Sequence, residues 1–234
     1  MENRLIFFLS FFIIICNSLF SADREKPGQN SQTIPDSIDN QILYNGRAWK
    51  NIYGRIQGNQ FLFTNDFLSG TVTIENKHFD VPRLKYDIYN DQLLTVTDKG
   101  IIIQLNKEYT DRFDLEYLNK IYRFKRLDAD SVRSLSGFVN VLYEGKISLF
   151  VKYRKSILLL AVDNKYDLFD QVQKMYLLKN GEIFFVKNRR SLLNLLKDQK
   201  QKVRSFIRTE KIKMSKLDPE SFVPVVNYYD KLLH

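Results

Sequence analysis

The side chains of this chain that could support acid–base or metal chemistry are its histidines and carboxylates. The histidines are scarce, and the carboxylates are dispersed along the sequence. The two histidines are His78, in a predicted hairpin turn, and His234, the last residue. A Ser-His-Asp triad would have to use His78, yet no GxSxG motif accompanies it. HExxH and CxxC motifs are absent too. We therefore predict no catalytic residue, no metal site and no cofactor.

Acidic side chains leave two weaker possibilities. Residues 127–130 (LDAD) and 164–167 (NKYD) carry the oxygen ligands that Ca²⁺ prefers, although loop acids are more often simply solvated. Glycoside hydrolysis needs two facing carboxylates, and no spacing in the sequence singles out a pair. A hydrolase that acts through carboxylates stays open as a third functional hypothesis.

Basic side chains, in contrast, are concentrated in one stretch. Residues 187–216 read KNRRSLLNLLKDQKQKVRSFIRTEKIKMSK and hold eleven Lys or Arg against two acids, a net charge of +9. The whole chain is also +9, so the remaining residues sum to zero. A charge this localised gives an electric field with a direction, which is informative about partners.

The spacing of these bases predicts a ridge on a helix. Lys200, Arg204 and Arg208 recur every four residues, about 120° from the apolar stripe when wound at 100° per residue. The bland interpretation is a solvated helix face; the sharper one is a surface for anionic lipid headgroups or an acidic envelope protein, with peripheral membrane contact. The candidate binding residues are Arg189, Arg190, Lys197, Lys200, Arg204, Arg208 and Lys211.

Helices must carry this ridge, because the apolar period changes near residue 188. An amphipathic stripe is formed by Leu192, Leu195, Leu196, Val203, Phe206 and Ile207. Ser191 is the expected N-cap of the first turns, and Asp198 could cap a second helix. A last helix should start near Asp218 or Ser221, with Pro224 in its first turn.

Between residues 41 and 187 the dominant pattern is period-two alternation broken by turn residues. Leu84, Tyr86 and Ile88 point one way before Asn90-Asp91 turns the chain. Further turns are predicted at Asn45-Gly46, Glu75-Asn76-Lys77, Asp98-Lys99-Gly100, Leu118-Asn119-Lys120, Glu144-Gly145 and Asn180-Gly181. The fold class predicted is α+β, mainly β: a curved antiparallel meander (sandwich or half-barrel) followed by two or three C-terminal helices, residues 188–234, packed on the sheet.

Two apolar runs interrupt the alternation, at residues 101–103 (III) and 157–162 (ILLLAV). Strands covered on both faces have this pattern, so we expect both runs in the middle of the fold. Residues 128–136 are the least strand-like and are predicted to form a loop.

Residues 1–22 are predicted to be a secretory signal peptide. One Arg precedes an apolar run of twelve residues, LIFFLSFFIIIC, which is too short to span a bilayer comfortably. Cleavage is expected after Ser21 or Ala22, and the polar residues 23–40 should form a flexible linker. The single cysteine, Cys16, lies in this signal, so the mature chain would have no disulfide. We expect export to the periplasm or the periplasmic face of the outer membrane, where nucleic acid is not a partner.

Three stretches in series resemble a large family of exported Bacteroidota envelope proteins that has no assigned activity. They are residues 70–94 (GTVTIENKHFDVPRLKYDIYNDQLL), 136–155 (SGFVNVLYEGKISLFVKYRK) and 174–214 (KMYLLKNGEIFFVKNRRSLLNLLKDQKQKVRSFIRTEKIKM). The resemblance covers most of the mature chain. It implies an envelope location in a Gram-negative host and carries over no catalytic residue.

The favoured hypothesis is a non-enzymatic envelope accessory or binding protein that uses the basic helix as its contact surface. The alternative is a periplasmic carrier that holds a lipid or another apolar ligand in the curved sheet. The apolar and aromatic content of the predicted strands motivates this alternative.

Overall fold

The computed structural model describes residues 41–128 and 135–233. The predicted signal peptide with Cys16, Ser21 and Ala22, the linker of residues 23–40, most of the loop expected at 128–136, and His234 lie outside the described residues.

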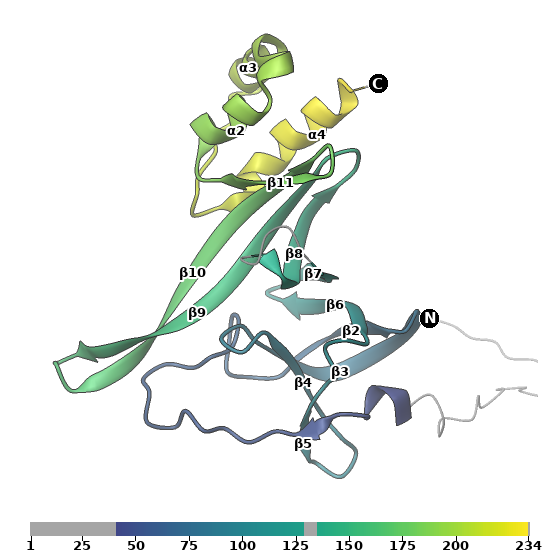
Figure 1. The fold of residues 1–234 in the computed structure, drawn as a ribbon, viewed down its shortest axis with the longest axis vertical. Helices are drawn as coiled ribbons and strands as arrows, with labels where there is room; N and C mark the ends of the chain where they lie inside the picture. Colours follow the sequence, from purple (N-terminus) through teal and green to yellow (C-terminus); the bar gives the residue numbers. More distant parts are fainter. Residues whose placement is uncertain (1–40, 129–134, 234) are drawn as a thin grey trace, which may run out of the picture. The chain divides into compact units, whose positions relative to one another are not determined.

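The described chain forms one antiparallel sheet with helices at its C-terminal end (Figure 1). The strands are β1 (Arg47–Ala48), β2 (Leu68–Ile74), β3 (Lys77–Asp87), β4 (Gln92–Val96), β5 (Ile102–Gln104), β6 (Thr110–Tyr117), β7 (Lys120–Leu127), β8 (Gly137–Glu144), β9 (Ser148–Val162), β10 (Tyr166–Lys179) and β11 (Glu182–Val186). The helices are α2 (Arg189–Leu195), the 3₁₀ turn η2 (Lys197–Gln199), α3 (Lys200–Thr209), the 3₁₀ turn η3 (Pro219–Phe222) and α4 (Val223–Lys231).

The strand order is β1-β5-β4-β3-β2-β6-β7-β8-β9-β10-β11, and the two ends of the sheet do not pair. Every neighbouring pair of strands is antiparallel. The sheet is therefore curved and unclosed, which confirms the predicted α+β, mainly-β fold class.

Tight turns with two residues of positive φ connect several of the strands. Glu75-Asn76 joins β2 to β3, and Leu118-Asn119 joins β6 to β7, with φ between 48° and 64° at these four residues. Asn180-Gly181 joins β10 to β11 in the same way. Such turns match the right-handed twist of the flanking strands. His78, expected in a turn, is instead the second residue of β3, because Glu75-Asn76 alone completes the reversal.

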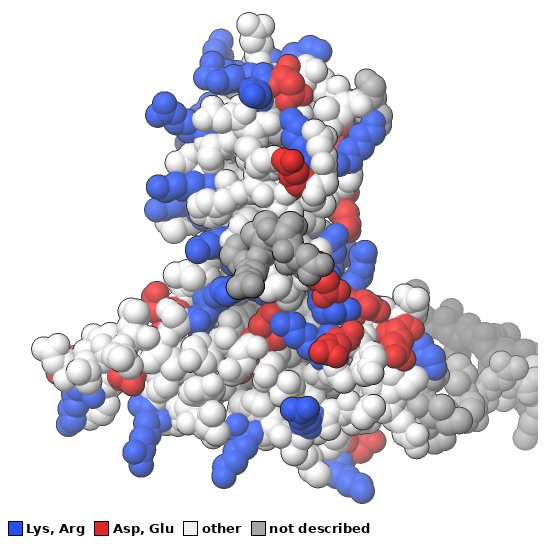
Figure 2. All heavy atoms as spheres, in the orientation of Figure 1, with Lys and Arg blue, Asp and Glu red and all other residues white. Residues whose placement is uncertain are grey.

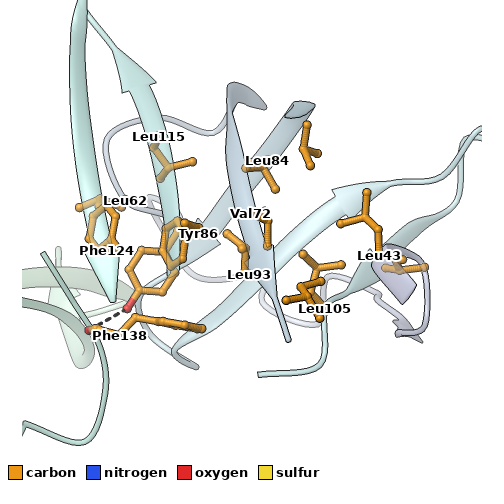
Figure 3. Packing of buried hydrophobic residues seen from close by; sticks show 14 of the residues in the cluster. Leu43, Leu62, Val72, Leu84, Tyr86, Leu93, Leu105, Leu115, Phe124 and Phe138 are labelled. Carbon is orange, nitrogen blue, oxygen red and sulfur yellow. Dashed lines mark hydrogen bonds between the residues drawn. The ribbon is translucent and has the colours of Figure 1, made fainter. Parts of the chain in front are cut away.

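The larger core lies between the strands of the β2–β8 region and combines mainly aliphatic side chains with a cluster of aromatic rings (Figure 3). Phe113 and Phe124 stack with their ring centres 4.6 Å apart, and Tyr86 meets Phe113 edge-on. The Tyr86 hydroxyl reaches the carbonyl of Phe138 at 3.4 Å. These rings pack with the aliphatic side chains of the cluster, and their mutual contacts add to the burial that holds the strands together.

A second core lies between the helices and the ends of β9, β10 and β11. Leu149 and Leu177 of the sheet are fully buried there against Leu192, Val203 and Tyr229. The stripe predicted for the helices is confirmed, because its members are buried or half-buried. This burial fixes α2 and α3 on the sheet and turns their polar sides outward.

The expectation that residues 157–162 lie in the middle of the fold is wrong. β9 pairs with β8 only over Ser148–Val151, and β10 pairs with β11 only over Met175–Lys179, so beyond these residues β9 and β10 continue as a two-stranded ribbon. Leu158, Leu159 and Leu160 are 44%, 76% and 55% exposed. The other apolar run is also only partly inside, since Ile101 is 51% exposed at the β4–β5 turn and Ile103 is buried.

The helix caps differ from the prediction. Asn188, and not Ser191, is the N-cap of α2: its side chain accepts from the Ser191 amide at 3.0 Å, and Ser191 Oγ accepts from the Asn188 amide at 3.0 Å. This reciprocal pair is a capping box, and its N-cap lies three residues before the predicted one. Asp198 does not cap α3, which begins without a side-chain cap. α4 follows the expectation, with η3 starting at Pro219 and Pro224 in the first turn of the helix.

Candidate functional site

Asp198, at the junction between α2 and α3, forms hydrogen bonds that connect this junction to the sheet and to α4. Its Oδ1 accepts from Lys179 Nζ of β10 at 2.9 Å, and its Oδ2 accepts from the Tyr229 hydroxyl of α4 at 2.7 Å. Burial alone would raise the pKa of Asp198, but these two hydrogen bonds outweigh it and hold the pKa below the usual value. One of the two acids in the basic stretch therefore has its charge compensated inside the fold.

α3 is held from the other side by apolar contacts. Val203 and Ile207 are buried in the second core, and the Phe206 ring stacks on Tyr228 of α4 with ring centres 4.0 Å apart. Because these residues face inward, the face of α3 that carries Lys200, Arg204 and Arg208 must face away from α4.

The seven predicted binding residues all lie on this helical end of the fold. Arg189 and Arg190 open α2, Lys197 lies in η2, and Lys211 follows the C-terminus of α3. Six of the seven are exposed, and Lys200 is half-buried. In Figure 2 basic side chains crowd the end of the molecule formed by α2 and α3, with few acids among them. We call these seven residues the basic face.

The cations of the basic face have no partners among the described residues, unlike several cations elsewhere in the fold. Elsewhere Lys107 and Lys152 pair with Asp91, Lys120 with Glu220 and Lys125 with Glu144. Over residues 41–128 and 135–233, no side-chain hydrogen bond or salt bridge engages any of the seven. Their charges are thus available to an external anion.

A buried polar cluster around Asp91 is the other concentration of titratable groups. Asp91 Oδ1 accepts from Lys152 Nζ at 3.0 Å and from the Tyr86 hydroxyl at 2.5 Å, while Oδ2 accepts from Lys107 Nζ at 2.5 Å. Lys152 is 3% exposed and also donates to the carbonyl of Phe138 at 2.7 Å. Burial lowers the pKa of Lys152 to about 8, against the opposing pull of Asp91.

Asp87 lies at the start of the same turn and is fully buried. It accepts from the amides of Tyr89 and Asn90 and from the Asn90 side chain, at 2.8–3.0 Å. Burial raises the pKa of Asp87, whereas burial, Lys152, Lys107 and Tyr86 together leave the pKa of Asp91 lowered. Two acids with opposite shifts can indicate an acid–base pair. Here both carboxylates are occupied by donors of the protein itself, so we interpret the cluster as structural.

Sequence patterns did not predict this cluster. Asp91 and Lys152 are 61 residues apart, and only the long-range pairing of strands brings them together. The available signal was a lysine that follows the apolar run SLFV in β9.

No metal centre is formed by the described residues: no three His, Asp or Glu side chains in residues 41–128 and 135–233 gather closely enough to hold an ion. The NKYD segment instead forms part of the β9–β10 turn, where Asp163 and Asn164 have positive φ. None of the helices in this part of the chain has the length and hydropathy needed to cross a bilayer.

Comparison with family models, with curated proteins and with solved structures finds no match to this chain.

Proposed function

We propose that this protein is a non-enzymatic binding protein that docks onto an anionic lipid surface through the basic face. The observation that carries the proposal is the presentation of seven cations without internal partners on helices whose apolar sides are fully used in packing.

The unpaired state of these side chains favours a lipid surface over a single acidic partner protein. Stereospecific pairing requires each long side chain to be held in one conformation, which costs entropy. Among the described residues, no hydrogen bond or salt bridge fixes any of the seven side chains in advance. Attraction to a headgroup layer needs no fixed geometry and contributes about 1 kcal/mol for each Lys or Arg near the surface.

Insertion into the acyl region is not part of this mechanism. The apolar residues of α3 are buried or stacked on α4, so α3 has no exposed apolar side to immerse. Binding should consequently be peripheral and governed by ionic strength. The carrier hypothesis has less support, because apolar side chains of the protein itself, mostly aliphatic, pack together within the curved sheet.

The test is co-sedimentation with vesicles of phosphatidylglycerol and phosphatidylcholine, compared with phosphatidylcholine alone. Replacement of Lys200, Arg204 and Arg208 by Gln should lower the partition coefficient about 100-fold, from about 1 kcal/mol per charge. Raising salt from about 0.05 M to about 0.5 M should have a similar effect on the unaltered protein.

The matched control replaces three exposed lysines outside the basic face, Lys50, Lys99 and Lys165, by Gln. It removes the same net charge and should retain most of the binding. Equal loss in both triple variants would show that net charge alone matters. Absence of binding to anionic vesicles at low salt, with salt-sensitive capture of an acidic protein instead, would overturn the lipid proposal.

A further inference from the structure

The outer edge of β10 is only partly covered. β11 pairs with β10 from Met175 to Lys179, and Gln57 forms an isolated bridge near Leu168. In the described residues, no strand pairs with this edge over residues 170–174. Figure 1 shows β11 lying along only the helical end of β10.

The backbone of this gap offers hydrogen bonds outward. The amide of Phe169 donates to the carbonyl of Gln57 at 3.0 Å, and the amide of Gln57 donates to the carbonyl of Asp167 at 2.9 Å. The direction of backbone groups alternates along a strand, so the N–H and C=O of Gln171 and Gln173 face the same edge. The five residues of the gap span roughly 17 Å, room for four or five residues of an added strand.

A groove of about 630 Å³ runs beside this gap. Its far wall is the segment around Leu217, which is tied to β10 where the Gln173 side chain donates to the carbonyls of Lys216 and Leu217. Val172, Phe185 and Leu217 line it with 43%, 51% and 80% of their surfaces exposed. We call this feature the β10 groove.

The charge of the β10 groove has one sign. Lys174, Lys187 and Lys216 are exposed along it and no acidic residue lines it, while Asp170 lies at the far end of the gap. None of the three makes a salt bridge with another described residue. An open strand edge beside exposed apolar side chains and unpaired lysines suits an extended segment with both apolar and acidic side chains.

We propose that the β10 groove binds an extended, acidic segment of a partner protein, which adds to the sheet as a strand beside β10. A second copy of this chain fits less well, because it would bring its own three lysines to the same seam. The β10 groove shares no residue with the basic face, so it extends the function beyond contact with lipid.

The probe is a fluorescent octapeptide of alternating Glu and Val, measured by anisotropy with the full protein. Two control peptides are a version with Lys in place of Glu, and a version N-methylated at alternate residues to remove the donors of one edge. The unmodified acidic peptide should bind at least about tenfold more tightly than either control, because the Lys version loses the charge contacts and the N-methylated version loses several backbone hydrogen bonds.

Gln171 supplies a matched pair of variants. Gln171→Pro removes an outward N–H without breaking a bond to β9, and proline is tolerated on strand edges. Gln171→Ala keeps that N–H. The proline variant should bind the acidic peptide at least about tenfold more weakly, and the alanine variant should bind it as the unaltered protein does.

Three results would overturn the proposal: no binding of the acidic peptide, equal binding of the N-methylated peptide, or a dimer in solution that only Gln171→Pro dissociates. The last would identify a second copy as the occupant. If the proline variant fails to fold, the N-methylated peptide on the unaltered protein still decides the question. Neither comparison changes a residue of the basic face.

Discussion

The buried Lys152 makes a testable prediction about the pH dependence of stability. Its pKa falls from 10.5 to about 8 in the folded protein, chiefly because burial disfavours the charged amine. In the unfolded chain the amine regains the higher value. Between these two pKa values the unfolded state binds more protons than the folded state, so the free energy of unfolding must rise with pH.

The size of the effect follows from the two pKa values. Below pH 8 the amine is charged in both states, and the burial cost is present in full. From pH 7 to pH 9 the proton leaves the folded protein first, which adds about 1.4 kcal/mol to the free energy of unfolding. Tyr153 acts in the opposite sense, since burial raises its pKa from 10.0 to about 12, but its loss of stabilisation starts near pH 10.

The measurement is urea unfolding at pH 7, 8 and 9, followed by the fluorescence of the single tryptophan, Trp49, which packs against Phe61. Lys152→Met should remove the rise of about 1.4 kcal/mol. Other titrating groups cancel in the difference between the two proteins. Substitution of the exposed Lys50 by Met is the control. A flat or falling difference between the unaltered protein and Lys152→Met would refute the assignment of the shift to burial of this amine.

Two further predictions concern stability. Asp230 is buried and accepts hydrogen bonds from the Ile147 amide at 2.8 Å and from the Tyr143 hydroxyl at 3.0 Å. Asp230→Ala should lower the free energy of unfolding in urea by about 2–4 kcal/mol, because it leaves the buried amide without a partner. An effect no larger than that of Asp218→Ala, which changes an exposed acid, would contradict this. Leu159→Ala on the ribbon should change stability by under about 0.5 kcal/mol, whereas Leu149→Ala in the second core should cost about 2–5 kcal/mol; similar losses in both would argue that the ribbon is packed.

Turn chemistry made most of the sheet predictable. Asn76, Asn119 and Gly181 favour positive φ, and each lies in a tight turn that the sequence marked in advance. The helical stripe was equally readable, because Val203 and Ile207 recur at helical spacing and are buried. Both signals depend only on residues close in sequence, so they can be interpreted without knowledge of the tertiary structure.

The wrong predictions about burial have a different cause. The apolar run at residues 157–162 has the composition of a central strand, but burial depends on whether neighbours extend as far as the strand does. β8 and β11 end before that point, so three leucines of β9 lie exposed. Leu160 also has a φ of 51°, which breaks the alternation expected of a strand. Lengths of neighbouring strands are not encoded in the run itself.

The basic face also combines a property that the sequence encodes, its charge, with one that depends on the fold, the absence of internal partners for that charge. The excess of cations in residues 187–216 is a property of the sequence. A cation is free to bind an external anion, however, only if no acid of the protein forms a salt bridge with it. The fold compensates Asp198 through Lys179 and Tyr229, and this removes the nearest acid from Lys197 and Lys200. Lysines of the strands, such as Lys125 with Glu144, meet acids on neighbouring strands. On the basic face no neighbouring strand supplies carboxylates, so its cations stay unpaired among the described residues.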